Sequence, residues 1–167
     1  MKWSYFPRNN YITDNLLNVV NAFAINEEKI TSADNSLHSD EVLHAVAEEL
    51  EKIGYVVEKS KRSEDKIKMP VLYGECGVPT VNFETDAYNK EFKTVIEVEA
   101  GRGVTNFQFL KDFFESCCMD NTDYLCIAVR QKYRNSNDYE KVCNFFDAMY
   151  ASKRFNVPLK GILIIGY

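Results

Sequence analysis

Two short apolar runs in the C-terminal third of the chain constrain its fold most. Residues 124–129 read Y-L-C-I-A-V and residues 159–165 read L-K-G-I-L-I-I. Nearly continuous apolar runs of this length are typical of strands that are covered on both faces of a sheet. Helical patterns of apolar residues accompany them, at 106–117 and 139–155. The two runs therefore predict an α/β fold with a central mixed β-sheet flanked by helices.

The N-terminal half adds helices and one more strand to this core. Apolar residues recur at helical spacing over residues 43–53, and residues 55–58 then read as a strand. A more modest helical pattern covers residues 13–23, and a polar loop follows it. We therefore expect an N-terminal helical appendage at residues 1–36 and a core domain at residues 37–167.

Negative charge is concentrated in residues 81–101, which read as two strands joined by a polar turn. Apolar and polar residues alternate along both runs, so each strand carries two carboxylates on one face. If the strands pair, four carboxylates share one face: Glu84, Asp86, Glu97 and Glu99. Like charges on paired strands repel, so this face is either fully solvated or holds a divalent cation. Carboxylate oxygens are the ligands that Mg²⁺ prefers.

The composition limits the class of protein. The chain has 167 residues, of which 46% are hydrophobic and 27% charged, as in one soluble globular domain. Its net charge of -5 argues against a nucleic-acid partner, although carboxylates neutralised by bound ions would count toward this total. Five cysteines without C-x-x-C spacing suit a reducing compartment, and two histidines do not suggest a zinc site. The chain has no apolar run of signal-peptide or membrane-spanning length, so we expect a cytoplasmic protein with no membrane partner.

The order of elements, with Asp86 late on one strand and E-V-E at 97–99 on the next, resembles the PD-(D/E)xK nuclease superfamily. The resemblance covers roughly residues 39–167 and implies a restriction-endonuclease-like fold. It also implies that Asp86, Glu97 and the main-chain carbonyl of Val98 bind Mg²⁺, for which Mn²⁺ can substitute. Thr85 replaces the usual proline, and Glu99 stands where the superfamily usually has lysine. Glu-x-Glu occurs in a minority of members, where the second glutamate could act as a base or bind a second cation.

The resemblance also points to residues outside the two strands. Many members carry a glutamate on the first core helix that contacts the metal through water, and Glu41 holds the matching place, with Glu48 as a competitor. Arg102, in the glycine-flanked turn after the second strand, could contact a phosphate of the substrate. Gln108 and Lys111 are further candidates on the helix that follows.

The function implied is a metal-dependent nuclease of restriction or defence type that hydrolyses DNA phosphodiester bonds. In such an enzyme the ion stabilises charge on the phosphate and lowers the pKa of a bound water. The alternative is a noncatalytic nucleic-acid-binding or assembly subunit of the same fold, which Glu99 and the acidic charge favour. A glycoside hydrolase with paired carboxylates is a third hypothesis, for which Tyr88 and Phe92 are weak aromatic support. A homodimer and a separate partner subunit both stay open.

Overall fold

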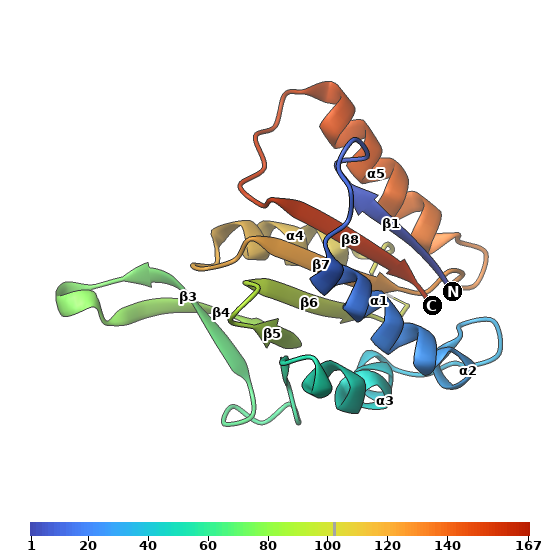
Figure 1. The fold of residues 1–167 in the computed structure, drawn as a ribbon, viewed down its shortest axis with the longest axis horizontal. Coiled ribbons are helices and arrows are strands. Elements are labelled where there is room, and N and C mark those ends of the chain that lie inside the picture. The colour runs from blue at the N-terminus through green and yellow to red at the C-terminus, as the bar shows by residue number, and fades with distance from the viewer. Residues whose placement is uncertain (102) are drawn as a thin grey trace.

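The computed structural model describes residues 1–101 and 103–167, whose centre is a six-stranded mixed sheet (Figure 1). Its strands are β1 (Lys2–Phe6), β2 (Val56–Val57), β5 (Ala87–Asn89), β6 (Thr94–Glu99), β7 (Tyr124–Val129) and β8 (Gly161–Gly166). They lie in the order β1-β8-β7-β6-β5-β2. The pairs β6–β7 and β7–β8 are parallel, and the other neighbouring pairs are antiparallel. The predicted α/β class and its central mixed sheet are confirmed.

Helices cover both faces of this sheet (Figure 1). The first face packs against α1 (Asp14–Ile25) and α3 (Ser39–Lys52), which the short α2 (Glu27–Ile30) separates. The second face packs against α4 (Gln108–Cys118) and α5 (Asp138–Ser152). Because side chains alternate along a strand, Ile96 and Val98 of β6 join the first core and Val95 joins the second.

Aromatic packing fixes the position of α4 on the sheet. Phe113 of α4 is buried and meets Phe146 of α5 edge to face, with ring centroids 5.4 Å apart. Phe109, one turn earlier, meets the same Phe146 ring at 6.3 Å. Edge-to-face pairs of this kind add roughly 0.5–1.5 kcal/mol to the burial of the rings. The helix face that carries Asp112 is thereby held over the strand β6.

The N-terminal segment contains a strand that the sequence analysis did not predict. Residues 1–36 hold α1 and α2, as expected for a helical appendage, but also β1, which pairs antiparallel with β8. Its Ser4 hydroxyl contacts the Tyr139 hydroxyl at 2.7 Å. The partner strand lies about 160 residues away in the chain, so no local pattern such as a hairpin turn indicates β1.

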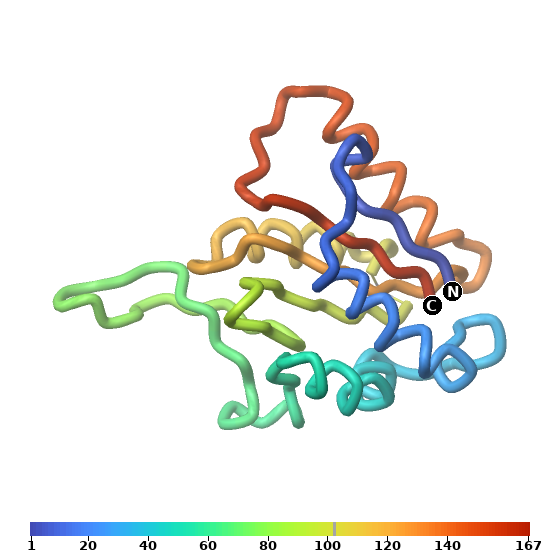
Figure 2. Tube along the Cα trace, in the orientation of Figure 1, coloured from blue at the N-terminus to red at the C-terminus, as the bar shows by residue number. Residues whose placement is uncertain are grey.

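A two-stranded ribbon projects from the body of the protein (Figures 1 and 2). It consists of β3 (Ile67–Tyr73) and β4 (Pro79–Thr85), with the single 3₁₀ turn Glu75–Gly77 at its tip. The sequence analysis predicted no strand between residues 58 and 81. Two prolines and two glycines gave the segment the composition of a loop, but an exposed ribbon tolerates such residues.

The predicted hairpin over residues 81–101 is wrong in its first half. The run 81–86 does not pair with 94–100, because β4 pairs with β3 and the chain enters the central sheet only after Thr85. The Thr85 hydroxyl donates to the carbonyls of Ala87 and Ile96 where the chain changes sheets. The hairpin that does form joins β5 to β6, with Asn89 opposite Thr94.

No helix in residues 1–101 or 103–167 has the length and apolar character needed to cross a membrane.

Candidate active site

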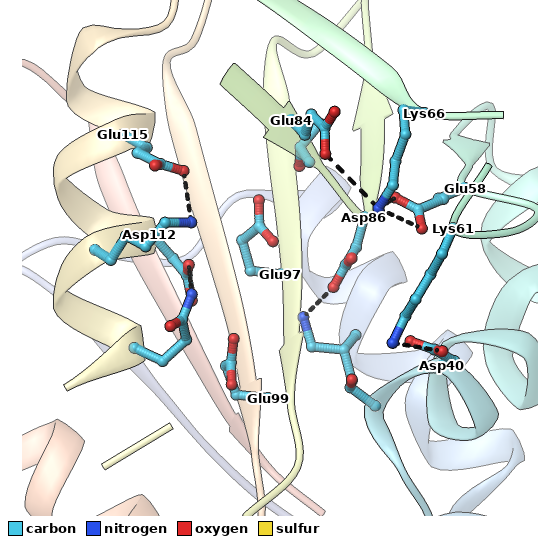
Figure 3. A pocket seen from close by; sticks show the side chains of 15 residues that line it. Asp40, Glu58, Lys61, Lys66, Glu84, Asp86, Glu97, Glu99, Asp112 and Glu115 are labelled. Atoms are coloured by element: carbon cyan, nitrogen blue, oxygen red, sulfur yellow. Dashed lines mark hydrogen bonds and ion pairs between the residues drawn. The ribbon is translucent and has the colours of Figure 1, made fainter. Parts of the chain in front are cut away.

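A polar cavity of about 210 Å³ lies between β6, the β4–β5 junction and α4 (Figure 3). We call it the acidic pocket. Its carboxylates come from Asp40, Glu58, Glu84, Asp86, Glu97, Glu99, Asp112 and Glu115. Its ammonium groups come from Lys61, Lys66 and Lys111. Carboxylates therefore outnumber cations by eight to three in one small space.

The strand β6 brings two of these carboxylates into the pocket. Val95 points into the core beneath α4 and α5, and side chains alternate along a strand. Glu97 and Glu99 therefore continue the line of Val95 on the same face of the sheet. Both side chains point into the pocket in Figure 3, and both are half-buried. The regular geometry of one strand fixes the spacing between them.

Asp86 joins them from the neighbouring strand. Ala87 pairs with Ile96, so Asp86, one residue earlier, lies beside Glu97. Its Oδ2 accepts a hydrogen bond of 2.8 Å from the Val98 amide, and its carbonyl accepts one of 2.8 Å from the Glu58 amide. These contacts hold Asp86 at the junction where the ribbon meets the central sheet.

Glu58 and Lys66 form an ion pair at the ribbon side of the pocket (Figure 3). Lys66 Nζ donates to both oxygens of Glu58 at 2.9 Å, and it lies 3.7 Å from Glu84. The Lys66 side chain is 19% exposed and the Glu58 side chain 8%, so the pair is largely shielded from water. Glu58 thus has a cationic partner of its own.

The helix α4 supplies a fourth carboxylate to the centre of the pocket. Asp112 is buried, and its Oδ1 accepts a hydrogen bond of 3.2 Å from Gln108. Its Oδ2 is also buried and has no hydrogen-bond partner among the described residues. A buried oxygen without a donor is costly to the fold. Asp112 therefore lacks a proton donor or a cation that would complete its contacts.

We call Asp86, Glu97, Glu99 and Asp112 the acidic quartet. Among the described residues, none of the four forms an ion pair. Burial raises the pKa of Asp86 to about 7, although the hydrogen bond from Val98 opposes this rise. Burial also raises the pKa of Asp112 to about 6.

The other two members respond to burial and to their neighbours. Burial and then the charge of Asp112 raise the pKa of Glu99 to about 9. Burial raises the pKa of Glu97 well above its ordinary range, and the charges of Asp86 and Asp112 add to this rise. The quartet therefore retains protons at neutral pH unless a cation takes their place.

The donor set of the quartet fits a hard divalent cation. All its ligand atoms are carboxylate oxygens, and the orphaned Oδ2 of Asp112 is one of them. Within the described residues, no three Asp, Glu, His or Cys side chains form a ready-made metal site. Mg²⁺ rarely needs one, because it is usually held by one or two carboxylates together with water and substrate phosphates. The quartet could therefore hold such an ion together with oxygen ligands from outside the chain.

The residues singled out from the sequence fall into three places. Asp86, Glu97 and Glu99 lie together in the acidic pocket, with Val98 beside them and with Gln108 and Lys111 on its α4 wall. Glu41 and Glu48 of α3 do not line this pocket: Glu41 accepts a hydrogen bond of 2.7 Å from the His38 amide, and Glu48 pairs with Lys52 at 2.9 Å. Arg102 lies outside the described residues.

Three central residues of the pocket were not predicted as site members, namely Glu58, Lys66 and Asp112. Asp112 carried a usable signal, because it is a charged residue between the inward-facing Phe109 and Phe113 of an amphipathic helix. Glu58 closes the short strand pattern of residues 55–58, where its burial could not be read from spacing. Lys66 directly precedes β3, so its direction depended on the unpredicted ribbon.

Comparison with known proteins assigns the chain to no family. No protein-family model matches it, and no curated protein sequence matches it. The functional interpretation therefore depends on the chemistry of the acidic pocket.

Proposed function

We propose that this protein is a metal-dependent nuclease that hydrolyses DNA phosphodiester bonds, with the acidic pocket as its active site. The observation that carries the proposal is the placement of Asp86 and Glu97 side by side at the β5–β6 pair, in a pocket with Glu99 and Asp112. A restriction-endonuclease-like fold and a restriction or defence role belong to the same proposal. The helix-covered mixed sheet supports it.

Each member of the pocket has a role in this reaction. Asp86 and Glu97 hold Mg²⁺, which when bound stabilises negative charge on the phosphate and activates a water. Glu99 and Asp112 face the pocket together, and their oxygens can orient the attacking water and accept its proton. The water oxygen bonds to phosphorus while one phosphorus–oxygen ester bond breaks, and the leaving oxygen takes a proton from solvent. Lys111, which pairs with Glu115 at 3.1 Å on the α4 wall, can also donate to the phosphate.

The test is cleavage of plasmid and linear DNA in the presence of Mg²⁺ or Mn²⁺. We expect Asp86→Asn and Glu97→Gln to lose at least about 100-fold in rate, because each removes a ligand charge. Glu48→Gln is the matched control, since this side chain is 82% exposed and far from the pocket chemistry. Circular dichroism of each variant shows that it is folded. Full activity in both pocket variants would reject the proposal.

A noncatalytic nucleic-acid-binding subunit is the second candidate. The specific observation in its favour is that Glu99, and not a lysine, lies beside Glu97 in the pocket. This candidate predicts DNA binding without cleavage in either cation. It also predicts that Asp86→Asn binds DNA at least as well as the wild type, because a negative charge is removed.

A further inference from the structure

A second cavity of about 810 Å³ adjoins the acidic pocket, and we call it the side cavity. The two share part of their lining, namely Ser39, Asp40, Lys61 and Glu99. Cavities of roughly 300–1,000 Å³ are of the size that small ligands occupy. A molecule bound at the acidic pocket can therefore continue into the side cavity.

Two carboxylates of the side cavity already have partners within the protein. Asp40 forms an ion pair of 2.9 Å with Lys61. Glu41 lines the side cavity and accepts a hydrogen bond of 2.7 Å from the His38 amide. Their charges are therefore partly offset, unlike those of the acidic quartet. Another cation in the lining then has a larger influence on what the side cavity binds.

That cation is Arg130, and it belongs to a cluster around Tyr133. Tyr133 lines both the side cavity and a third cavity of about 550 Å³. The guanidinium carbons of Arg130 and Arg134 lie 5.3 Å and 5.2 Å from the centre of its ring, within cation–π range. Arg130 lines the side cavity and also donates to the Leu37 carbonyl, and Arg134 lines the third cavity. One ring thus holds a guanidinium in each cavity.

The Tyr133 ring packs closely against the backbone of Gly101. Gly101 has φ +87°, and a Cβ placed there would lie 2.7 Å from Cε2 of Tyr133. Such a contact is too close for any side chain, so the ring can approach the chain only because residue 101 is glycine. Tyr133 is nevertheless only partly buried. The cavity wall therefore presents an aromatic surface in a fixed position.

We propose that Tyr133, Arg130 and Arg134 bind unpaired nucleotides of the substrate next to the phosphate held in the acidic pocket. The exposed Arg134 guanidinium leaves the Tyr133 ring to bind a flanking phosphate, a base stacks on the ring face that it vacates, and Arg130 binds the other phosphate. The position of the scissile phosphate in this arrangement rests on the proposed nuclease function. The substrate class is then a nucleic acid with a single-stranded segment, such as an overhang or a flap.

The location of Tyr133 is what favours unpaired nucleotides over a continuous duplex. In a duplex the faces of the bases are stacked on one another, and only their edges are accessible in the grooves. A ring in the wall of a cavity can stack on a base only when that base has left the helix. Aromatic rings combined with arginine are the groups that proteins use to bind single strands.

The experiment is binding of a short single-stranded oligonucleotide that carries the fluorescent base 2-aminopurine, measured in Ca²⁺. We expect Tyr133→Ala to weaken binding at least about 5-fold and to remove the fluorescence quenching that stacking causes. Tyr133→Phe keeps the ring and should keep both signals. Tyr11→Ala is the matched control, because Tyr11 is 85% exposed and lies outside both cavities.

A second variant keeps the test decisive if Tyr133→Ala does not fold. Arg134→Ala, at an exposed position, should weaken binding of the same oligonucleotide and reduce its salt dependence. Arg154→Ala, also exposed, should change neither. Binding that is equal in wild type, Tyr133→Ala and Arg134→Ala overturns the proposal. Equal losses for the single strand and for a blunt duplex overturn it too.

The outcome separates this inference from the nuclease proposal. If no DNA is cleaved but oligonucleotide binding depends on Tyr133, the nuclease proposal fails and the binding site stands. If DNA is cleaved in an Asp86-dependent way and binding ignores Tyr133, the binding site alone fails.

Discussion

Two kinds of buried carboxylate lie next to one another in the acidic pocket. Glu58 is bonded through both oxygens to Lys66 at 2.9 Å, so its negative charge is matched where it lies. In the acidic quartet Asp112 is as buried as Glu58 and the other three members are half-buried, but among the described residues the quartet has no ion pair. The first is a finished structural contact. The acidic quartet is neutralised only when it takes up protons or a cation. Carboxylates in a cleft with strongly shifted pKa values are typical of functional sites.

The largest effect on stability should come from breaking the matched pair. Lys66→Met leaves the Glu58 carboxylate buried beside the quartet without a cation, and we expect a loss of about 3 kcal/mol in the free energy of unfolding. Urea unfolding monitored by circular dichroism measures it. The effect is large because the Glu58 side chain is only 8% exposed.

The double variant Glu58→Leu/Lys66→Met is the control for this prediction. Replacing both members of a buried ion pair with apolar groups is often close to neutral, so most of the lost stability should return. A cost of less than about 0.5 kcal/mol for Lys66→Met is the size of an ordinary surface substitution. It would mean that Lys66 does not neutralise a buried Glu58 charge.

The quartet predicts an effect of smaller size that depends on pH. The pKa values are about 7 for Asp86, about 6 for Asp112 and about 9 for Glu99, whereas in an unfolded chain they are about 4. At pH values between the pKa values of the unfolded chain and those of the folded protein, the folded protein holds more protons. Its free energy of unfolding therefore falls as the pH rises. Between pH 6 and pH 9 we expect the metal-free protein to lose at least about 1.4 kcal/mol, the energy of one pKa unit. Urea unfolding in EDTA measures this loss.

Two controls connect the pH effect to the quartet. Glu97→Gln removes one of the mutually repelling charges, so the fall in stability with pH should be shallower. Mg²⁺ should restore stability at the upper end of the range, because a ligand that binds only the folded state stabilises it. Stability that is independent of pH in EDTA would mean that the quartet carries no unfavourable charge.

The sequence predicted the parts of the fold whose signal is local. The apolar run 124–129 became β7 with the same bounds, and the helical pattern that ends near Gly54 became α3. The pairing of distant segments was not predictable in this way. β1 pairs with β8 at the other end of the chain, and the ribbon formed by β3 and β4 has the composition of a loop.

The same division holds for the site. Alternation along β6 was enough to predict that Glu97 and Glu99 share a face. Asp86 directly precedes β5 and lies beside Glu97, but the pairing of residues 81–86 with 94–100 from which its position was predicted is wrong. Glu84 was expected on that face as well, but it lies on the ribbon strand β4, before the chain enters the central sheet, and lines the pocket from there at 3.7 Å from Lys66. Asp112 enters from a helix on the second face, and only the packing of α4 on β6 brings it there.

The smallest effect is expected at Glu41, a predicted site residue that has a hydrogen-bond partner within the protein. It tests whether such a partner is enough to exclude a carboxylate from the site. The resemblance assigned Glu41 to the metal through water, yet its carboxylate accepts a hydrogen bond of 2.7 Å from the His38 amide at the start of α3. Glu41→Ala should therefore cost about 1 kcal/mol or less in stability, as the loss of a helix cap does, and leave DNA cleavage unchanged. Glu41→Gln separates the cap from the charge, because glutamine can still bond the amide. If Glu41→Gln keeps its stability but loses cleavage, Glu41 acts with the quartet, and a partner within the protein is not enough to set a carboxylate apart from the site.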